Sequence, residues 1–534
     1  MALRINFNYE AAVTHTALKQ NERLMNRSLL RLSTGLRILN AADDSAGLFI
    51  ADQLALVSAG LEQGNRNIQT GISALQIAEN SAGQIYNKLK QIYVKAENAA
   101  NDINDPNARA SLQREINNLI DAIKKIGTDT EYNGIKLLDG TFVNKSIHYG
   151  ARKDQVVTVN ISSVLPKDLG AYIAKAQGAQ YTGGTPTTAA TFLSALGTGQ
   201  SWFVENGEYV DVAGIRVISY DGTNRFVDAK TLADNINADK DLQALGIEAV
   251  AKNDNTASAS FTGFSNLYST RSSATLTALT LNFYIGNTAV STTTAKTFSV
   301  DIDSSVTSLN QLVDKINSAA SAAGANIKAK AVNSKLVLET GSGETIAVHI
   351  QAQGTLSGST VGSVTVHLGQ LFEGLGDVGF TAQTKNNLYY IDVGTVDIAG
   401  VDTYQLKYSG VSASNAGFNF DVSSGSNATA KNLNTVSVLT NAQAEESLLI
   451  IKKAIQRVDI VRSEIGAVMN NLQTIYDAQK VAKDNTDQAE NVIRNVDFAK
   501  EMMTFTTMQI RMQSGVAMLA QANTLPQLVL QLLR

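Results

Sequence analysis

The chain has 534 residues, with 44 Lys and Arg against 48 Asp and Glu, so its formal net charge of −4 excludes a general electrostatic attraction to nucleic acid or to an anionic membrane. Cysteine is absent, which excludes disulfides, thiolate metal sites and cysteine nucleophiles. Hydrophobic residues make up 44% of the chain, enough for several folded domains and too much for a disordered chain.

The N-terminus shows no basic start followed by the apolar run of about 7 to 15 residues that marks a cleaved secretory signal. No stretch of about 18 apolar residues predicts a membrane-spanning helix. We therefore expect the protein to be either intracellular or exported by a route that does not read a cleaved signal peptide.

Helical spacing begins close to the N-terminus. Apolar residues three, four or seven apart predict a first helical seam, made of Leu18, Met25, Leu29, Leu32, Leu36 and Leu39. His15 lies three residues before Leu18, so we expect it to pack on the same seam. Asp43 and Asp44 follow and are expected to cap the next helix.

The second seam is long and uninterrupted. Apolar and small residues alternate at steps of three and four, at Leu54, Val57, Leu61, Gly64, Ile68, Gly71, Leu75, Ala78, Ala82, Ile85, Leu89, Ile92, Ala96, Ala99 and Ile103, with Ile50 upstream. This period of 3.5 is typical of a left-handed coiled coil, and the helix would be about 80 Å long. An ordinary amphipathic core helix is the alternative, but a compact domain cannot enclose such a length. Gly64 and Gly71 each cost about 1 kcal/mol against Ala, so we expect a neighbouring helix to approach closely there.

A shorter helix is predicted to follow and to fold back on the long one. Asp105 before Pro106 has the form of an N-cap with proline at the first helical position. The apolar face of this helix is formed by Leu112, Ile116, Leu119, Ile123 and Ile126.

Between residues 171 and 430 the helical pattern gives way to Ser, Thr, Gly, Ala and Asn, with strand-like runs at 275–286, 296–302 and 335–340. The segments LADNIN (232–237) and LVDKIN (312–317) predict a duplicated strand–helix–strand unit, and in each copy a second Ile, Ile247 or Ile327, lies eleven residues after the Ile of the segment. We therefore expect one or two inserted β-rich domains.

Two further features of this region have an ordinary structural interpretation. GLGDVG (374–379) matches a dinucleotide fingerprint, but a strand-like run follows it where the fingerprint requires a helix, so we interpret it as a turn. Trp202 is interpreted as a core residue of a small domain rather than as a sugar platform.

The C-terminal part mirrors the N-terminal part. A third seam contains Leu448, Ile451, Ile455, Val458, Val461, Ile465, Val468, Leu472 and Ile475, and a last segment contains Phe498, Met502, Phe505, Met512, Val516 and Leu519. We expect the two chain ends to pair, seam against seam. The outermost helices have few partners within the chain, so we expect them to fray in the monomer and to become ordered when other subunits cover them.

No pattern in the sequence predicts an active site. Phosphate-binding loops, zinc-protease helices, nucleophile elbows and EF-hand loops are missing. We therefore expect no enzyme activity, no catalytic residue, no cofactor and no metal site.

The two ends resemble bacterial flagellin. The resemblance lies in LLRLSTGLRILNAADDSAGLFIADQL (29–54), EYNGIKLLDG (131–140), VRSEIGAVMNNL (461–472) and LAQANTLPQLVLQLLR (519–534). It covers about 170 residues at the N-terminal side and 90 at the C-terminal side. The middle resembles the family only in being a variable insert.

The resemblance implies an α+β multidomain fold, with a long coiled-coil-like helical rod built from both chain ends and an inserted β-rich variable outer region. The implied divisions are residues 1–42 and 492–534 as inner-core helices, 43–170 and 431–491 as the two halves of the rod, and 171–430 as the outer region. The rod seam is then formed by Leu54, Val57, Leu61, Ile68, Leu75, Ile85, Leu89, Ile92, Leu448, Ile451, Ile455, Val458, Ile465 and Leu472.

The same resemblance implies a subunit that assembles with itself into the flagellar filament used for swimming. Contacts of the polymer inner core would be made by Leu18, Leu29, Leu32, Phe505, Val516, Leu519, Leu528 and Leu532. Implied partners are other copies of the chain, an export chaperone at the C-terminal segment, and the filament cap and junction proteins, with no nucleic acid or membrane. The implied location is the extracellular filament, reached unfolded through the flagellar type III apparatus.

One departure from the family concerns an innate immune receptor that reads an Arg and a Leu on the long rod helix of many flagellins. The aligned positions here are Gln91 and Lys95, whereas Glu115, further along that epitope, is retained. We therefore expect weak or absent recognition by that receptor.

Two alternatives remain beside the filament subunit. One is a hook–filament junction protein that shares these ends. The other is a filament subunit whose insert acts as an adhesin or carbohydrate-binding module.

Overall fold

The computed structural model describes residues 8–101, 103–177, 180–183, 203–204, 209–219, 225–226, 228–270, 275–286, 296–355, 363–381, 387–409 and 426–532. The chain divides into two compact units. The first comprises Met1–Ser81, Thr130–Ser162 and Arg462–Arg534, and the second comprises Ala82–Asp129 and Ser163–Val461. Trp202, for which a core position is expected, lies outside the described residues.

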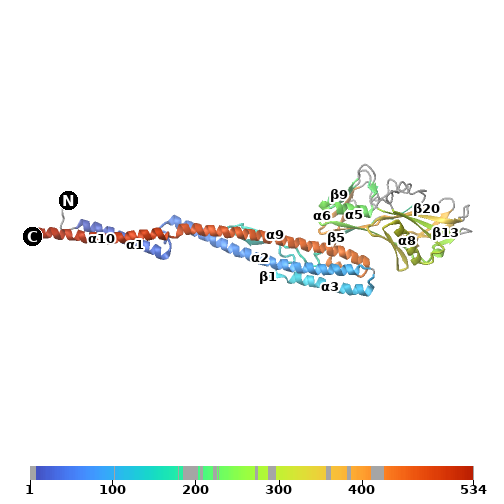
Figure 1. The fold of residues 1–534 in the computed structure, drawn as a ribbon, viewed down its shortest axis with the longest axis horizontal. Helices are drawn as coiled ribbons and strands as arrows, with labels where there is room; N and C mark the ends of the chain where they lie inside the picture. Colours follow the sequence, from blue (N-terminus) through green and yellow to red (C-terminus); the bar gives the residue numbers. More distant parts are fainter. Residues whose placement is uncertain are drawn as a thin grey trace. The chain divides into compact units, whose positions relative to one another are not determined.

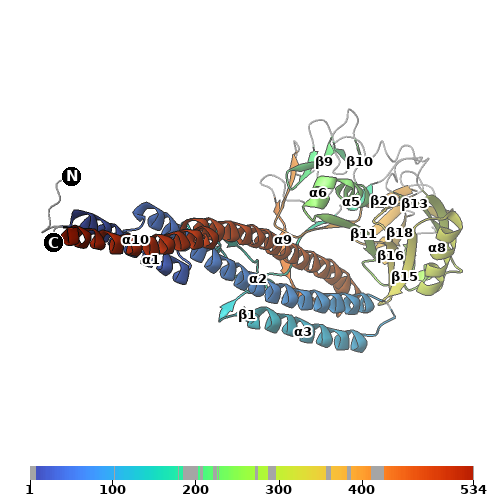
Figure 2. The same ribbon diagram turned by 60° about the vertical axis from the view of Figure 1, so that its left-hand side comes forward.

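In the first unit the two chain ends form an antiparallel helix pair, as the matching seams predict. Helices α1 (Tyr9–Thr34) and α10 (Phe498–Leu532) lie side by side in both ribbon views (Figures 1 and 2). Side chains of α1 and of its N-cap residue, Asn8, donate to backbone carbonyls of α10 along the whole pair: Asn8 to Ala522 at 2.9 Å, Asn21 to Met508 at 3.0 Å and Ser28 to Glu501 at 3.4 Å. Because these donors sit on the first chain end and the acceptors on the last, the two ends hold each other in one register.

The long predicted helix is confirmed, although its end is one turn earlier than the pattern indicates. Helix α2 spans Ser45–Ala99, 55 residues, or about 80 Å. Beyond it, Ile103 is 89% exposed and does not extend the seam. The carbonyl of Ala99 accepts a hydrogen bond from Arg109 Nε at 2.9 Å, and Asn104 donates to Asn98. These side chains therefore supply donors to the last turn of α2, in place of the backbone N–H groups that a further helical turn would provide.

Only one of the two aspartates expected to cap α2 does so. Asp44 accepts a hydrogen bond from the Gly47 N–H at 2.8 Å, in the first turn of the helix. Asp43 instead accepts from the Leu39 N–H at 3.0 Å and forms an ion pair with Arg27. It therefore fixes the connection between α1 and α2 rather than the helix end.

The close approach expected at the glycines of α2 is present, but the neighbour is not a helix. A Cβ atom at Gly64 would overlap the backbone carbonyl of Tyr149, and one at Gly71 would meet the Ile147 side chain. Both neighbours belong to or adjoin a hairpin of β3 (Lys145–His148) and β4 (Val156–Val159). The glycines thus make room for a β-hairpin, which helical spacing alone does not predict.

Helix α9 (Asn441–Arg494) runs antiparallel to α2 within the first unit. Asp487 accepts a hydrogen bond from Ser58, Tyr476 accepts one from Gln69 at 2.9 Å, and Arg462 forms an ion pair with Glu79 at 2.8 Å. The order of these pairs is opposite in the two helices, which confirms that the two seams from the ends of the chain meet.

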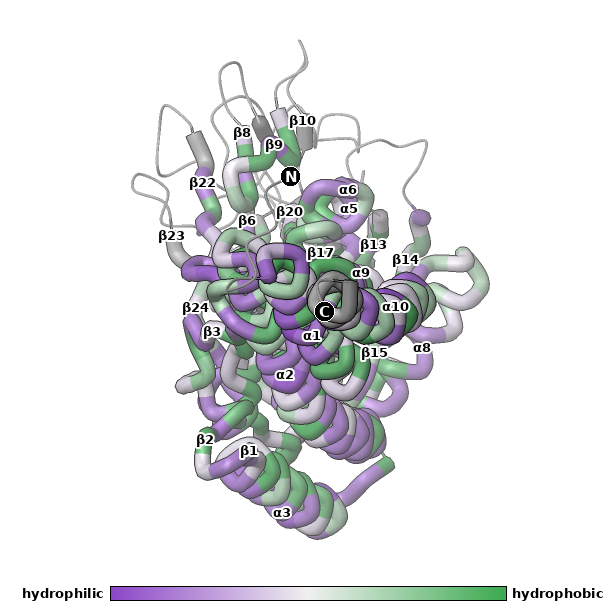
Figure 3. Tube along the Cα trace, turned by 90° about the vertical axis from the view of Figure 1, so that its left-hand side faces the viewer, coloured by the Kyte–Doolittle hydropathy of each residue, from purple (hydrophilic) through white to green (hydrophobic). Residues whose placement is uncertain are grey.

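Helix α3 (Pro106–Asp129) begins in the second unit as its sequence predicts. Asp105 accepts a hydrogen bond from the Ala108 N–H at 2.7 Å. Ile116 and Ile123 are buried, and Leu112, Leu119 and Ile126 are half-buried. Figure 3 shows green and purple residues alternating along α3, as expected for a helix with one apolar face.

The inserted region of the second unit is built from antiparallel sheets. A six-stranded sheet has the order β15 (Ile327–Val332), β16 (Lys335–Thr340), β11 (Glu248–Thr256), β21 (Thr395–Gly400), β5 (Gly170–Gln177), β24 (Thr429–Asn432). A five-stranded sheet has the order β14 (Lys296–Asp303), β13 (Thr275–Gly286), β17 (Thr345–Thr355), β20 (Asn387–Asp392), β6 (Gln180–Gly183). The three predicted strand runs therefore appear as β13, β14 and β16.

Smaller sheets complete the described strands. One has the order β23 (Ser426–Asn427), β22 (Gln405–Ser409), β8 (Tyr209–Val212), β9 (Ile215–Ser219), and another the order β12 (Tyr268–Thr270), β18 (Ser363–His367), β19 (Asp377–Thr381). The remaining pairs are β7 (Phe203–Val204) with β10 (Arg225–Phe226), and β1 (Glu131–Tyr132) with β2 (Ile135–Lys136) of the first unit. Short helices are α6 (Lys240–Ala244), α7 (Phe264–Leu267), η1 (Leu368–Gln370) and η2 (Leu433–Thr435). GLGDVG runs from a turn into β19, so it is not a phosphate-binding loop.

The duplicated unit predicted from LADNIN and LVDKIN is confirmed at the level of single hydrogen bonds. These segments lie in α5 (Ala229–Ala238) and α8 (Leu309–Ala323), which precede β11 and β15. In the first copy, Asn237 donates to the Ala249 carbonyl at 2.7 Å and accepts from the Ala249 N–H at 2.9 Å. In the second copy, Asn317 makes the same two bonds with Ala329, at 2.9 and 2.7 Å. Each helix is therefore clamped to its following strand by one asparagine.

Replacing Asn317 by Ala is expected to lower the stability of the inserted region by about 1 to 3 kcal/mol. The substitution leaves the N–H and carbonyl of Ala329 without their side-chain partner, and an unmade bond at a part-buried group has a cost of this order. Denaturant unfolding monitored in the insert measures the loss. Asn310→Ala, at an exposed position of the same helix, is the control and should change stability by less than about 0.5 kcal/mol; equal losses in both variants would show that the clamp contributes nothing.

A buried carboxylate at the start of the first repeat gives the insert a pH dependence. Asp228 caps α5 by accepting from the Thr231 N–H at 2.7 Å, and it also accepts from the Thr345 hydroxyl at 3.1 Å. Burial raises the pKa of Asp228 to about 7 in spite of these hydrogen bonds. The side chain is completely inaccessible to solvent, so its ionised form is disfavoured in the folded protein.

We expect the stability of the insert to fall as the pH rises from about 4 to about 7. Because the folded pKa lies above the unfolded value of 3.8, this contribution is complete below that value and is lost as the pH rises through about 7. In Asp228→Asn the cap is kept, since Asn is an equally good N-cap residue, and the loss between these pH values should shrink by about 2 kcal/mol or more. Urea unfolding at a series of pH values tests this, and identical pH profiles for the two proteins would contradict it.

Candidate self-assembly surface

Helices α1 and α10 expose an unusual number of large apolar side chains. Between a third and three quarters of each side chain is accessible, in the set Tyr9, Val13, Leu24, Leu29, Leu30, Phe498, Met502, Met503, Ile510, Val516 and Met518, which we call the terminal apolar set. Among the described residues of these helices, only Ser28 and Ala522 are fully buried. Exposed apolar side chains in such number are typical of a protein–protein interaction site.

The helix geometry explains why this set stays exposed. Asn21 and Ser28 are seven residues apart, so they mark the face of α1 that touches α10. Tyr9, Val13 and Leu24 lie on another face of α1. On α10, Met503, Ile510 and Met518 recur at spacings of seven and eight, away from the carbonyls of Glu501 and Met508 that bind α1. Each helix therefore covers only one side of its partner.

Some of the predicted inner-core residues lie on exposed faces of α1 and α10, and others lie where the two helices touch. Leu29 and Val516 are 51% and 53% exposed. Leu18, Leu32, Phe505 and Leu519 are half-buried, and Leu18 contacts α10 where a Cβ at Gly515 would meet its Cδ1 at 2.8 Å. Leu18 thus serves the pair within the chain. Leu528 and Leu532 belong to α10, but their side chains lie outside the described residues.

The fourteen predicted rod-seam residues all lie away from solvent to some degree. Ten are buried, namely Leu61, Ile68, Leu75, Ile85, Leu89, Ile92, Ile451, Val458, Ile465 and Leu472. Leu54, Val57, Leu448 and Ile455 are half-buried.

Besides Ile103, two further positions expected on the seams, Ile50 and His15, are exposed in the monomer. Ile50 is 50% exposed near the start of α2, whereas its neighbour Ala51 is buried. His15 is also exposed rather than packed, since Leu18 and Asn21 take the α10-facing positions of α1.

The residues aligned with the immune-receptor epitope lie in the second unit. Gln91 is exposed on α2, and Lys95 of the same helix forms an ion pair with Glu115 of α3. The carboxylate of Glu115, the one retained epitope residue, is therefore engaged in an ion pair with Lys95.

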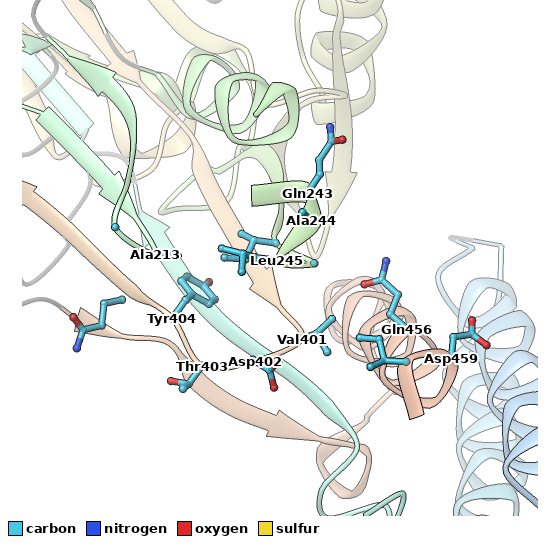
Figure 4. A pocket seen from close by; sticks show the side chains of 15 residues that line it. Ala213, Gln243, Ala244, Leu245, Val401, Asp402, Thr403, Tyr404, Gln456 and Asp459 are labelled. Carbon is cyan, nitrogen blue, oxygen red and sulfur yellow. The ribbon is translucent and has the colours of Figure 1, made fainter. Parts of the chain in front are cut away.

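A groove of about 860 Å³ in the second unit shows no catalytic arrangement. Figure 4 shows Gln456 and Asp459 of α9 on one side and Ala213, Leu245 and Tyr404 on the other. The Tyr404 hydroxyl donates to the Ile398 carbonyl at 2.6 Å, and Asp402 forms an ion pair with Arg457 at 2.5 Å. These polar groups therefore serve the fold.

The described part of the chain contains neither a metal-ligand cluster nor a helix that could span a membrane. Within it, no three His, Asp or Glu side chains are grouped so that they could hold a metal ion. None of its helices combines the length and the apolar content that crossing a membrane requires.

Sequence spacing missed part of the terminal apolar set. Tyr9, Val13, Leu24, Leu30, Met503 and Ile510 lie off the seams and are 42% to 70% exposed. In the sequence these residues form a second apolar face on each helix. A pattern of one apolar seam per helix does not include that second face.

Comparison with known proteins agrees with this arrangement. Residues 5–143 match the N-terminal helical region of bacterial flagellin, and residues 448–533 match its C-terminal helical region. The flagellin of Aquifex aeolicus is 50% identical over 545 aligned positions, and that of Aquifex pyrophilus is 49% identical over 536, with both chains covered completely in each case. Flagellin A of Helicobacter pylori is 28% identical, again over the whole of both chains.

Among solved structures, a flagellar junction protein from Legionella pneumophila is 13% identical, with 83% of this chain and 99% of that chain covered. Its TM-score of 0.30 is too low to bear on the choice between filament and junction protein. The full-length relatives and the two matched helical regions, in their order at the two ends, decide the matter: the chain belongs to the bacterial flagellin family.

Proposed function

We propose that the terminal apolar set of α1 and α10 is the surface through which copies of this chain join in the flagellar filament. As a flagellin the chain is a structural filament subunit and not an enzyme. The observation that carries the proposal is the exposure of both outer faces of the α1–α10 pair.

The free energy gained by burying these faces is large enough to drive association between subunits. Full burial of a Leu, Phe or Met side chain contributes roughly 1.5 to 3 kcal/mol, and the side chains in question are about half covered already. Completing the burial of the terminal apolar set would therefore contribute on the order of 10 kcal/mol, from which association subtracts several kcal/mol of lost freedom. Repeated contacts of this strength suffice for a polymer and leave a single subunit soluble.

The proposal assigns a layer to each part of the chain. Residues 1–42 and 492–534 form the inner core, 43–170 and 431–491 form the rod around it, and 171–430 form the variable outer region. The change from uncovered helices at the chain ends to sheets that bury cores of their own in the insert supports this order.

Other proteins would cover the same exposed faces before and during assembly. An export chaperone at the C-terminal segment would shield α10 until the chain passes, unfolded, through the type III apparatus without a cleaved signal. At the two ends of the filament, cap and junction proteins would cover the faces that no further subunit occupies.

Truncation tests the assignment. Removing residues 1–42 or 492–534 should abolish seeded filament growth in electron micrographs, because either deletion destroys the α1–α10 pair. Removing 171–430, joined by a short Gly-Ser linker, should leave growth intact. Growth of both end-truncated proteins at the wild-type concentration would refute the proposal.

The alternatives predict different outcomes, and the full-length flagellin relatives do not favour them. A junction protein would not elongate filament seeds when salt is added, whereas a filament subunit should. An adhesin insert would bind a glycan surface, and that binding would be lost when 171–430 is removed.

Weak recognition by the immune receptor remains a prediction. Monomer should give little or no signal in a reporter-cell assay, since Gln91 and Lys95 replace the side chains that the receptor reads and Lys95 is paired with Glu115. Signalling at the potency of an ordinary flagellin would overturn it. If recognition is weak as expected, the two substitutions Gln91→Arg and Lys95→Leu in one chain should restore it.

A further inference from the structure

Methionine is concentrated in the last helix. Five of the eight methionines lie in α10, at positions 502, 503, 508, 512 and 518. Among the methionines of the described residues, only Met503, Met518 and Met502 are more than half exposed, at 67%, 63% and 52%. The others in that part of the chain, Met25, Met469, Met508 and Met512, are half-buried.

The three exposed thioethers lie within the terminal apolar set. Met503 and Met518 share one face of α10 with Ile510, and Met502 is four residues from Phe498 and fourteen from Val516, which places these three on a second face. The face with Met503 and Met518 points away from the contact with α1, which is marked by Glu501, Met508 and Gly515. The second face borders that contact, since Phe498 lies next to Gly35 at the end of α1.

We propose that Met502, Met503 and Met518 are oxidation sites, and that their conversion to the sulfoxide by a hydroperoxide prevents the free subunit from joining the filament. This rests on the proposed function, in which the same faces are covered by other subunits. Once covered, the three sulfur atoms are shielded, so the assembled filament resists the oxidant that disables the monomer.

The chemistry needs only the hydroperoxide. The thioether sulfur attacks one peroxide oxygen, the O–O bond breaks and an S–O bond forms. Sulfur is oxidised by two electrons, and hydrogen peroxide is reduced to water. Thiol-dependent reductases reverse the step, one enzyme for each sulfoxide epimer.

The sulfoxide disrupts assembly because it replaces an apolar thioether by a strong hydrogen-bond acceptor on faces that other subunits are proposed to cover. The nearby hydroxyl groups are already committed, since Thr506 donates to the Met502 carbonyl and Thr507 to the Met503 carbonyl, both at 2.8 Å. Burying an acceptor without a donor is costly, whereas the thioether is apolar and adapts to irregular neighbours.

The test treats monomer and filament with the same dose of hydrogen peroxide and maps sulfoxides by mass spectrometry. In the monomer, Met503 and Met518 should oxidise first, then Met502, and the half-buried methionines last. In the filament these three should react at least tenfold more slowly. The oxidised monomer should require at least a tenfold higher concentration to elongate seeds, and treatment with both sulfoxide reductases should restore growth.

A matched variant separates the effect of these three methionines from that of the other five. The triple substitution Met502→Leu, Met503→Leu and Met518→Leu keeps apolar volume and helix propensity, so it should assemble within twofold of wild type before and after peroxide. The pair Met503→Gln and Met518→Gln places polar groups there without oxidant and should weaken growth in the same direction.

Two results would overturn the inference: wild type carrying all three sulfoxides that elongates seeds at the unoxidised concentration, or a triple-Leu variant that peroxide disables as fully as wild type. Failure of the proposed function is distinguishable, because charged substitutions at Leu29 and Val516 would then also leave assembly unchanged.

Discussion

Leu29→Asp and Val516→Asp, combined in one chain, are expected to raise the concentration needed for filament growth by about a hundredfold or more. Both side chains are about half exposed in the monomer, so the substitutions leave its fold intact. In the filament each would place a carboxylate where an apolar side chain is covered, at a cost of at least about 1.4 kcal/mol per site, or tenfold each. Seeded growth followed by light scattering measures the effect.

The matched control is Val332→Asp, the same kind of change at a side chain of similar exposure in β15 of the insert. It lies opposite Lys335 in the hairpin, so the new carboxylate has a favourable neighbour, and growth should match wild type. Equal growth by the doubly charged variant would mean that these faces are not polymer contacts.

Gly64→Ala is expected to destabilise the first unit by about 2 to 3 kcal/mol, although alanine is the better helix former. A Cβ at this position would overlap the carbonyl carbon and oxygen of Tyr149, and these are backbone atoms that cannot turn aside as a flexible side chain would. The hairpin of β3 and β4 must move, and overpacking of this kind costs about 1 to 3 kcal/mol or more. Thermal unfolding and amide exchange in the hairpin measure the loss.

Gly466→Ala is the counterpart in α9 of the same unit. No heavy atom lies within 4 Å of a Cβ built there, so only helix propensity acts and a gain of about 0.5 to 1 kcal/mol is expected. Opposite signs for the two variants are the diagnostic result. A stabilising effect at both positions would mean that α2 does not meet the hairpin as described.

The helices could be predicted from the sequence because their signal is local and repeated. Steps of three and four from Leu54 to Ala99 indicate one long helix, and Asp105 before Pro106 marks the start of the next. The repeated LADNIN and LVDKIN segments likewise predict α5 and α8. Their asparagine clamps to Ala249 and Ala329 are equally regular, but they become visible only when the strand that follows each helix is in place.

Other features could not be predicted because they depend on contacts distant in the sequence. The neighbour of Gly64 is a hairpin about eighty residues away, and nothing near the glycine indicates it. Asp43 and Asp44 are adjacent and chemically identical, yet only Asp44 caps α2, because Arg27 lies beside Asp43. The candidate surface was found in part, since Leu29 and Val516 were expected from the flagellin resemblance, whereas Tyr9, Val13 and Ile510 lie off the seams.

In the proposed assembly, helices α1 and α10 are incompletely covered in one chain and become covered by other copies. Amide hydrogen exchange compared between monomer and filament tests it most directly, because it reports the protection of each segment in both states. We expect fast exchange in residues 9–34 and 498–524 of the monomer, strong protection of both in the filament, and little change in β13 and β17 of the insert. Unchanged exchange in α1 and α10, with new protection confined to the insert, would contradict it.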